Sequence, residues 1–231
     1  MDKYSILKQY YGHSAFRAGQ EALIDAILSG RDALCVMPTG GGKSLCYQIP
    51  ALLLPGITLV VSPLISLMKD QVAALKSAGV PAAYINSSLT GEQIRTVYAR
   101  TRKGAYKLIY VAPERLETNS FLSLMQEMDV SFLAVDEAHC ISQWGQDFRP
   151  SYLGIVDFIN ALPRRPIVAA YTATATKQVQ SDILRLFQLQ SPYRIVTGFD
   201  RPNLYFHVHR PTNKFSALTA LIDGRPERSG C

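Results

Sequence analysis

Met37-Pro38-Thr39-Gly40-Gly41-Gly42-Lys43-Ser44 is the stretch of sequence that decides the fold. It lies between a β-prone run, residues 32–37, and a segment of helical period that opens at Lys43. Glycines there let backbone amides turn toward a phosphate, a lysine reaches the β- and γ-phosphates, and a serine hydroxyl binds Mg²⁺. The stretch therefore predicts a phosphate-binding loop with nucleotide contacts from Thr39, Gly40, Gly41, Gly42, Lys43 and Ser44, although Met37 stands where the strict pattern has glycine.

Short β-prone runs alternate with longer helical segments on both sides of this loop. The β-prone runs are residues 32–37, 57–61, 82–85, 107–111, 131–135, 167–171 and 193–196. The helical segments are 44–53, 66–77, 90–102, 118–127, 151–161 and 176–187, after a leading pair at 3–10 and 19–28. This alternation predicts an α/β fold with a mostly parallel sheet and helices on both faces.

A second constellation, Val135-Asp136-Glu137-Ala138-His139, follows a continuous apolar run typical of a strand buried on both sides. Open α/β sheets present ligands at the carboxyl ends of their strands. We expect Asp136 to hold Mg²⁺, Glu137 to orient and deprotonate an attacking water, and His139 to relay nucleotide state to a neighbouring element. A solvated turn is the alternative, but the phosphate-binding loop earlier in the chain favours one combined catalytic site of Lys43, Asp136 and Glu137.

Composition bounds the class of protein. The 231 residues are 48% hydrophobic, enough to bury a full core, and the apolar runs are too short to cross a bilayer. The amino terminus lacks the pattern of a secretory signal, so we expect a cytoplasmic location. Cys35, Cys46, Cys140 and Cys231 lie far apart, which indicates reduced thiols, three of them in the core, without zinc or a disulfide framework.

Charge is unevenly placed along the chain. The formal net charge is +6, and all of the excess lies in residues 161–231. A basic flank suits a phosphate backbone, and an ordinary solvated surface is the alternative. We predict three parts: a helical lead-in at 1–30, a nucleotide-binding domain at 31–200, and an exit segment at 201–231 that holds an extended run to His209 and a helical patch.

Two further motifs carry a family resemblance. They are Ser62-Pro63-Leu64-Ile65-Ser66-Leu67-Met68-Lys69-Asp70-Gln71 and Cys140-Ile141-Ser142-Gln143-Trp144-Gly145 continuing to Asp147-Phe148-Arg149-Pro150. With the phosphate-binding loop and the Asp-Glu-Ala-His box, in this order and spacing, the chain resembles RecQ helicases of superfamily 2 over nearly its whole length. The resemblance implies a RecA-like P-loop NTPase domain of a monomeric ATP-dependent DNA helicase, an ATP hydrolase that uses Mg²⁺ and unwinds DNA 3′ to 5′.

The same resemblance implies partners and a cellular role. We expect the domain to bind single-stranded and duplex-junction DNA, to act in DNA repair and recombination, and to associate with the nucleoid if the source is bacterial. Phe16-Arg17-Ala18-Gly19-Gln20 resembles the motif that reads adenine, so Gln20 would bond the base with Arg17 beside it. His13 stands where many relatives stack a tyrosine on the base. For Gln20, an exposed position at a helix start is the alternative.

Contacts to DNA are implied at several motifs. Ser62, Pro63 and Leu64, and likewise Pro113, Glu114 and Arg115, match positions that touch the strand backbone, although both are also ordinary strand-to-helix turns. Thr172 and Thr174 match a motif that links hydrolysis to movement, or else they cap the next helix. Trp144, Phe148 and Arg149 would clamp a base while sensing the nucleotide site, and a buried aromatic cluster is the alternative.

The resemblance also implies a second RecA-like lobe in cis that completes the ATP site with arginines, followed later by a four-cysteine zinc module. Glu227-Arg228-Ser229-Gly230-Cys231 resembles the residues just before the first strand of that lobe. We therefore expect the chain alone to bind ATP, hydrolyse it slowly and fail to unwind DNA. An RNA-directed motor of the same superfamily and a non-hydrolysing, nucleotide-dependent DNA-binding module are the alternatives.

Overall fold

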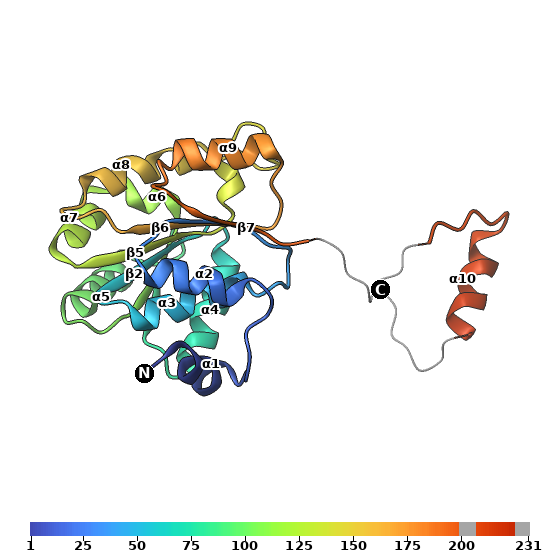
Figure 1. Ribbon diagram of the computed structural model, residues 1–231, viewed down its shortest axis with the longest axis horizontal. Coiled ribbons are helices and arrows are strands. Elements are labelled where there is room, and N and C mark those ends of the chain that lie inside the picture. The colour runs from blue at the N-terminus through green and yellow to red at the C-terminus, as the bar shows by residue number, and fades with distance from the viewer. Residues whose placement is uncertain (199–206, 225–231) are drawn as a thin grey trace. The chain divides into compact units, whose positions relative to one another are not determined.

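The computed structural model describes residues 1–198 and 207–224, which fall in two compact units, Met1–Gly198 and Phe199–Cys231 (Figure 1). The second unit holds one described helix, α10 (Lys214–Asp223), whose first turn is capped by the Asn213 side chain. His207–His209 lie outside any strand, and the remainder of the expected extended run, like Glu227–Cys231, lies outside the described residues. The three-part division of the chain stays a prediction.

One parallel sheet forms the centre of the first unit. Its strands are β1 (Ala33–Val36), β2 (Ile57–Val61), β3 (Ala82–Ile85), β4 (Leu108–Val111), β5 (Val130–Val135), β6 (Ile167–Thr172) and β7 (Tyr193–Val196), in the order β3-β4-β2-β5-β6-β1-β7. Every pair in it is parallel, which confirms the predicted sheet. Val61 pairs with Val135 and Val36 with Thr172, so the carboxyl ends of these four strands share one edge.

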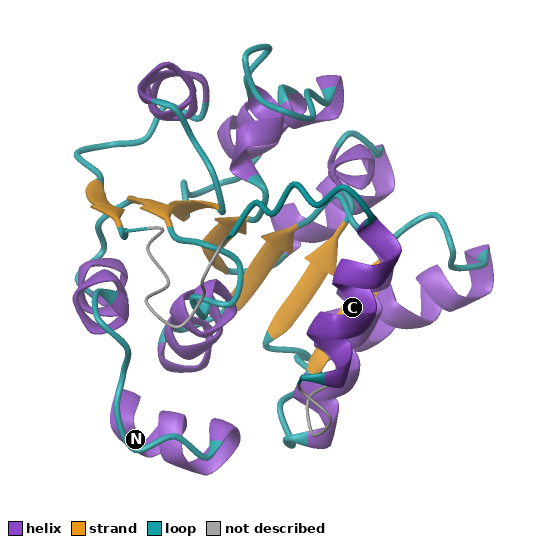
Figure 2. Cartoon of the chain, turned by 90° about the vertical axis from the view of Figure 1, so that its right-hand side faces the viewer, coloured by secondary structure: helices purple, strands orange, loops and turns teal. Residues whose placement is uncertain are grey.

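Helices cover both faces of this sheet, as the alternation predicted (Figures 1 and 2). The helices of the first unit are α1 (Lys3–Tyr11), α2 (Gln20–Leu28), α3 (Lys43–Leu53), α4 (Ile65–Ser77), α5 (Gly91–Arg102), α6 (Pro113–Leu116), α7 (Asn119–Glu127), α8 (Gly154–Ala161) and α9 (Lys177–Leu186). Two 3₁₀ turns, η1 (Ala138–Ile141) and η2 (Pro150–Tyr152), follow β5. Among the described residues, no helix is both long and apolar enough to cross a bilayer.

Alternate residues of each strand supply two hydrophobic cores. Leu34 and Val36 of β1 face the core shared with α7, α8 and α9, whereas Cys35 faces the core shared with α2, α3 and α4. Cys35, Cys46 and Cys140 are free and buried, as predicted, and Cys231 lies outside the described residues. Burial raises the pKa of Cys35 and Cys140 to about 12, so both thiols stay protonated at neutral pH.

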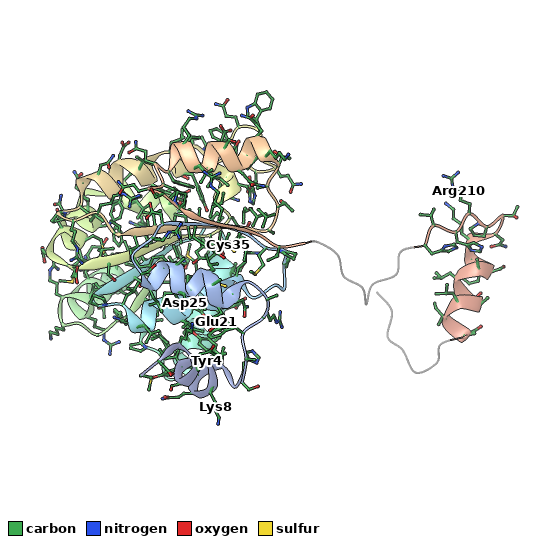
Figure 3. All side chains as sticks on the ribbon, in the orientation of Figure 1. Tyr4, Lys8, Glu21, Asp25, Cys35 and Arg210 are labelled. Carbon is green, nitrogen blue, oxygen red and sulfur yellow. The ribbon has the colours of Figure 1, made fainter. Side chains whose placement is uncertain are left out.

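The two leading helices are joined to each other. Lys3 of α1 forms ion pairs with Glu21 and Asp25 of α2, at 2.9 and 2.5 Å, and the Tyr4 hydroxyl donates to Glu21. Figure 3 shows Tyr4, Glu21 and Asp25 together on these helices. The contacts are exposed, so their main effect is to fix the geometry of the connection between the helices, residues 12–19.

The opposite, amino-terminal edge of the sheet is tied by one buried carboxylate. Asp32, only 3% exposed, accepts hydrogen bonds from the backbone amides of Val168 at 2.9 Å and Gln190 at 2.7 Å. Arg165 pairs with the same carboxylate at 2.6 Å. Asp32 therefore joins the residues just before β1, the start of β6 and the connection that enters β7.

Candidate nucleotide-binding site

The loop between β1 and α3 has the geometry of a phosphate cradle. Gly42 occupies the cap position of α3 with φ +86°, a left-handed conformation that glycine adopts without strain. A Cβ at Gly42 would also collide with the side-chain amide of Gln20. Lys43 opens the helix, and its Nζ donates to the carbonyl of Met37 at 2.9 Å. The lysine thus lies across the loop with its charge held beside the helix N-terminus, where an anion is stabilised.

The candidate base-reading residues are attached to this loop. Gln20 begins α2 and is 1% exposed, so the alternative of an exposed helix-start position is wrong. Its Oε1 accepts from the Arg17 amide at 2.8 Å, and its Nε2 donates to the Gly41 and Gly42 carbonyls at 3.2 and 3.3 Å. Arg17 Nη1 donates to the Gly40 carbonyl at 2.5 Å. A polar side chain that could hydrogen-bond a base therefore lies within contact of the phosphate loop.

The two acids lie at the carboxyl end of β5. Asp136 is 8% exposed; burial, followed by the charge of Glu137, raises its pKa to about 6. The Glu137 amide donates to Asp136 Oδ1 at 3.0 Å, and Glu137 itself has φ +48°, which is strained for a residue with a side chain. The Tyr152 hydroxyl, which sequence patterns did not single out, donates to the Asp136 carbonyl at 2.9 Å.

His139 connects the acids to the next strand. Its Nδ1 lies 3.3 Å from Glu137 Oε2 and 2.9 Å from the Thr172 hydroxyl at the end of β6. Thr172 also bonds with the backbone of Thr174. The alternative that Thr172 and Thr174 cap the following helix is wrong, because Thr176 caps α9 by accepting from the Val179 amide at 3.3 Å.

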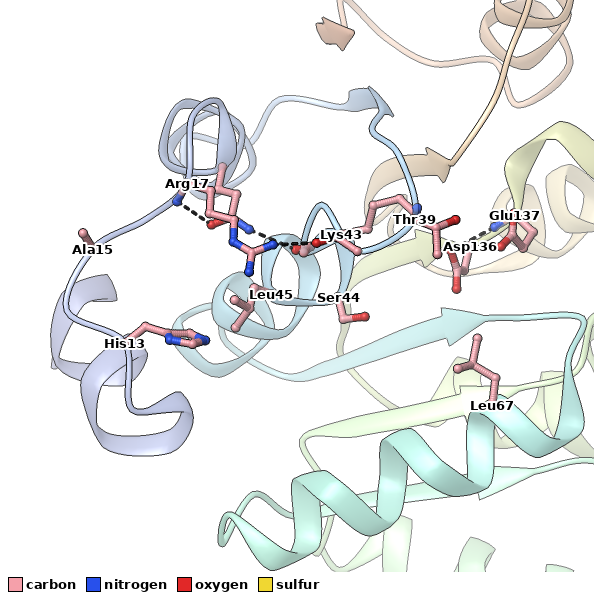
Figure 4. Close-up of a pocket in the computed structure, with 13 residues that line it drawn as sticks. His13, Ala15, Arg17, Thr39, Lys43, Ser44, Leu45, Leu67, Asp136 and Glu137 are labelled. Carbon is pink, nitrogen blue, oxygen red and sulfur yellow. Dashed lines mark hydrogen bonds between the residues drawn. The ribbon is translucent and has the colours of Figure 1, made fainter. Parts of the chain in front are cut away.

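These groups surround one cavity of about 460 Å³, within the range of small-molecule sites (Figure 4). Its lining residues are His13, Ala15, Arg17, Gln20, Thr39, Gly40, Gly42, Lys43, Ser44, Leu45, Leu67, Asp136 and Glu137. Of the predicted nucleotide contacts, Gly41 alone is absent from this lining. Ala15 and Leu45 are additions that no charge or motif signal marked, and Leu67 belongs to the Ser62–Gln71 motif without having been assigned to the nucleotide, because apolar walls are recognisable only once the helices are placed.

The donor set at the phosphate end of the cavity fits magnesium. The Ser44 hydroxyl and the Asp136 carboxylate both line it, and Mg²⁺ prefers oxygen ligands, taking one or two from protein and the rest from phosphate and water. Burial raises the pKa of Asp136, so its charge is poorly solvated and would be stabilised by a cation. The expected absence of zinc stays a prediction.

The residues expected to contact DNA form two groups. In the first, Arg149 pairs with Asp147 at 2.8 Å and donates to the Pro63 carbonyl at 3.3 Å, joining the aromatic segment to the turn between β2 and α4. Trp144 is 75% exposed, which excludes the buried-cluster alternative for this side chain. Phe148 is half-buried. The Ser62 hydroxyl, at the end of β2, is buried with no hydrogen-bond partner among the described residues.

The second group lies at the turn from β4 into α6. Pro113 is buried at the start of that helix, whereas Glu114 is exposed and accepts from the Ser151 hydroxyl at 3.1 Å. Arg115 is half-buried. Both Ser62-Pro63 and Ala112-Pro113 are strand-to-helix turns, so their geometry is compatible with either interpretation, and their DNA contacts stay predictions.

A glycine-rich loop between a parallel strand and a helix, facing paired acids at the end of a neighbouring strand, defines a P-loop nucleoside triphosphatase domain of RecA-like fold. The sequence matches the DEAD/DEAH box helicase family over residues 17–182. The chain belongs to that family, and within it the chain is similar to RecQ helicases.

The similarity to curated relatives covers nearly the whole chain. This chain is 47% identical over 227 residues to the ATP-dependent DNA helicase RecQ of Bacillus subtilis, and the alignment covers 98% of this chain and 38% of the relative. The RecQ helicase of Haemophilus influenzae is 48% identical, with 98% and 36% covered. The chain thus spans little more than a third of the length of these relatives.

Solved structures support the fold. The Hef helicase domain of Pyrococcus furiosus superposes with a TM-score of 0.61 at 21% identity, covering 78% of this chain and 38% of that one. The helicase MrfA bound to DNA gives a TM-score of 0.67 at 15% identity, covering 85% and 29%. At identities this low, the structural similarity establishes the RecA-like architecture and nothing about the ligand.

Proposed function

We propose that this chain is the first RecA-like lobe of a RecQ-like, ATP-dependent DNA helicase and that it binds Mg-ATP in the 460 Å³ cavity. One observation carries the proposal: a single cavity is lined by the candidate base reader Gln20, the lysine of the glycine-rich loop and a pair of acids. The motifs that supply them are separated in sequence by up to about half the chain. The glycine-rich loop and the acids follow β1 and β5 at the same edge of the parallel sheet, and Gln20 is hydrogen-bonded to that loop.

The residues divide the work along the cavity. Gln20 and Arg17 would bind the base with His13 stacked on it, and the amides of residues 39–44 with Lys43 would hold the phosphates. Ser44 and Asp136 would hold Mg²⁺, which neutralises phosphate charge when bound. Glu137 would accept a proton from the attacking water at its carboxylate. His139 Nδ1, 3.3 Å from Glu137 Oε2, would respond to the protonation of that carboxylate. Its contact with the Thr172 hydroxyl would carry the change to the end of β6.

The activity of the complete protein belongs to the same proposal. Arginines from a second RecA-like lobe would complete the site, and an arginine of this kind contributes roughly 10³- to 10⁵-fold in turnover. The complete protein would act as a monomer on single-stranded and junction DNA and would unwind duplex DNA from 3′ to 5′. It would do so in the cytoplasm, associated with the nucleoid, during DNA repair and recombination. The names of the RecQ relatives and the exposed Trp144 support DNA as the substrate.

The test is calorimetric titration of the chain with β,γ-imido-ATP and Mg²⁺, followed by ATP turnover of wild type and Glu137→Gln. We expect saturable binding that needs Mg²⁺, and slow turnover that the Glu137→Gln variant abolishes without losing affinity. Turnover that is equal in both proteins would contradict the role of Glu137 and favour a non-hydrolysing binding module. Stimulation of the complete helicase by RNA rather than by single-stranded DNA would favour the RNA-directed alternative.

A further inference from the structure

A buried aspartate on α9 contacts the segment that carries Trp144. Asp182 is 8% exposed, and its Oδ2 accepts a hydrogen bond from the Ser142 hydroxyl at 2.7 Å. Ser142 is fully buried, and its hydroxyl oxygen accepts from the Trp144 amide at 3.2 Å. The Ser142 hydroxyl holds the pKa of Asp182 below its usual value, so the bond is charge-assisted at neutral pH.

The Trp144 segment is a compact turn whose direction depends on these bonds. The Ser142 amide donates to the His139 carbonyl at 3.1 Å, and the Gly145 amide donates to the Ser142 carbonyl at 2.9 Å. A Cβ at Gly145 would collide with the His139 carbonyl, so the turn is tightly packed. A cavity of about 320 Å³ separates the Trp144 and Phe148 side chains from Gln178, Asp182 and Arg185 of α9. Across this space, the bond from Ser142 to Asp182 is a direct polar link between the segment and the helix.

The first turn of the same helix is joined to the nucleotide site. Gln180 Nε2 donates to the Ala175 carbonyl at 3.0 Å, which fixes α9 to the residues that follow β6. One residue before Ala175, the Thr174 amide donates to the Thr172 hydroxyl, and that hydroxyl lies 2.9 Å from His139 Nδ1. A continuous path therefore runs from Glu137 to Asp182 and back to Trp144, through the 3.3 Å contact of Glu137 with His139, the hydrogen bonds described above, the peptide link from Thr174 to Ala175 and the first turns of α9. Contiguous packed networks of this kind can carry energetic coupling between sites.

We propose that Asp182 is a positioning residue: by holding Ser142, it makes α9 and the Trp144 segment respond as one body to the state of the nucleotide site. This inference rests on the proposed binding of nucleotide between Lys43 and Glu137. Without the Asp182 bond, the segment would keep η1 and the hydrogen bond from Arg149 to the Pro63 carbonyl, but it would lose its polar link to α9. A rearrangement at His139 that moves α9 would then no longer be passed to the exposed Trp144 side chain.

The chain supplies its own probe, because Trp144 is its only tryptophan. Intrinsic emission and acrylamide quenching are measured while the protein is titrated with β,γ-imido-ATP and Mg²⁺, and calorimetry gives the affinity separately. We expect wild type to show a saturable change in Trp144 emission or quenching. Asp182→Ala should lose this change and keep nucleotide affinity. Asp182→Asn should retain it, since the amide oxygen still accepts the Ser142 proton.

Two further variants separate positioning from general stability. Arg185→Ala is the matched control on the same helix, because it removes the 3.1 Å ion pair with Asp182 and leaves the Ser142 bond intact. It should keep the Trp144 response. Ser142→Ala breaks the bond from the other side and should lose the response, which keeps the inference testable if Asp182→Ala does not fold.

Three results would overturn the inference. They are a wild-type protein that binds nucleotide with no change at Trp144, a folded Asp182→Ala protein that keeps the change, and a variant whose affinity falls together with its response. Absence of calorimetric binding in wild type would instead refute the proposed function, and this inference with it.

Discussion

Replacing Asp136 with asparagine is expected to stabilise the nucleotide-free protein while weakening its binding of magnesium nucleotide. The substitution keeps the shape of the side chain, and the amide oxygen can still accept from the Glu137 backbone N–H, a bond of 3.0 Å in the native site. It removes the charge. That charge is buried at the end of β5 next to a second acid, so in the absence of a cation it opposes folding.

The magnitude follows from the pKa. Burial raises the pKa of Asp136 from 3.8 to about 6, and one pKa unit corresponds to about 1.4 kcal/mol. Because the folded pKa is the higher one, this group's contribution to stability is fully present below pH 3.8 and is lost as pH rises through about 6. Asparagine should therefore raise the free energy of unfolding by about 3 kcal/mol at pH 8 and by about half as much near pH 5.

The assay is urea denaturation followed by circular dichroism, with EDTA present, at pH 5 and pH 8. Asp182→Asn is the control, because Asp182 has the same exposed fraction as Asp136, 8%, whereas its pKa is lowered by the Ser142 hydroxyl. That carboxylate stabilises the fold when ionised, above its unfolded pKa, and this stabilisation is lost as pH falls through the folded pKa. Its replacement should therefore destabilise the protein at both pH values.

Calorimetry with Mg²⁺ and β,γ-imido-ATP completes the test. If Asp136→Asn is no more stable than wild type at pH 8, the buried-charge argument is wrong. If it is more stable but binds magnesium nucleotide normally, the argument for burial survives and the assignment of Asp136 to the metal is refuted.

Four other variants test separate contacts. Lys43→Ala should remove Mg-ATP binding without unfolding the domain, and unchanged affinity in a folded variant would count against the phosphate-loop assignment. Gln20→Ala should blur discrimination between ATP and GTP in competition titrations, because the base would lose its hydrogen-bonding partner; retained selectivity would exclude that role. Arg149→Ala, in the complete helicase, should leave ATP binding near normal and weaken DNA stimulation of hydrolysis, and equal loss without DNA would indicate packing instead. Asp32→Asn should lower the free energy of unfolding by about 2 kcal/mol, since it weakens charge-assisted bonds to Arg165 and two backbone amides; an unchanged urea midpoint would contradict this.

The sheet and the longer helices were predictable because burial imposes a readable period. Strands β2, β3 and β7 have the predicted bounds. Strand β1 is buried on both faces, because its alternate residues pack into two different cores. The short elements α6 and η1 were missed, and most of η2 was predicted as the start of the helix at 151–161. A turn of three or four residues shows no period, so its conformation depends on tertiary contacts such as the bond from Tyr152 to the Asp136 carbonyl.

The candidate site was predictable to the extent that topology alone places residues. Parallel strands put Lys43 and Asp136 at one edge, and motif spacing was enough to expect that. Sequence could not show that Gln20 is buried against the phosphate loop, that Arg149 reaches Pro63, or that Thr176 rather than Thr172 caps α9. Each depends on side-chain packing or on a local choice between equivalent hydroxyls, and neither leaves a period or a spacing in the chain.

The carboxylate of Asp32 has a practical consequence for engineering this domain. It joins three segments at the amino-terminal edge of the sheet, whereas every proposed ligand of the nucleotide lies at or beyond the carboxyl edge. Stability and chemistry therefore occupy opposite ends of the same strands. Substitutions around Asp32, Arg165 and Gln190 could tune thermal tolerance independently of the chemistry, and the strained Glu137 could be left untouched while the fold that supports it is reinforced.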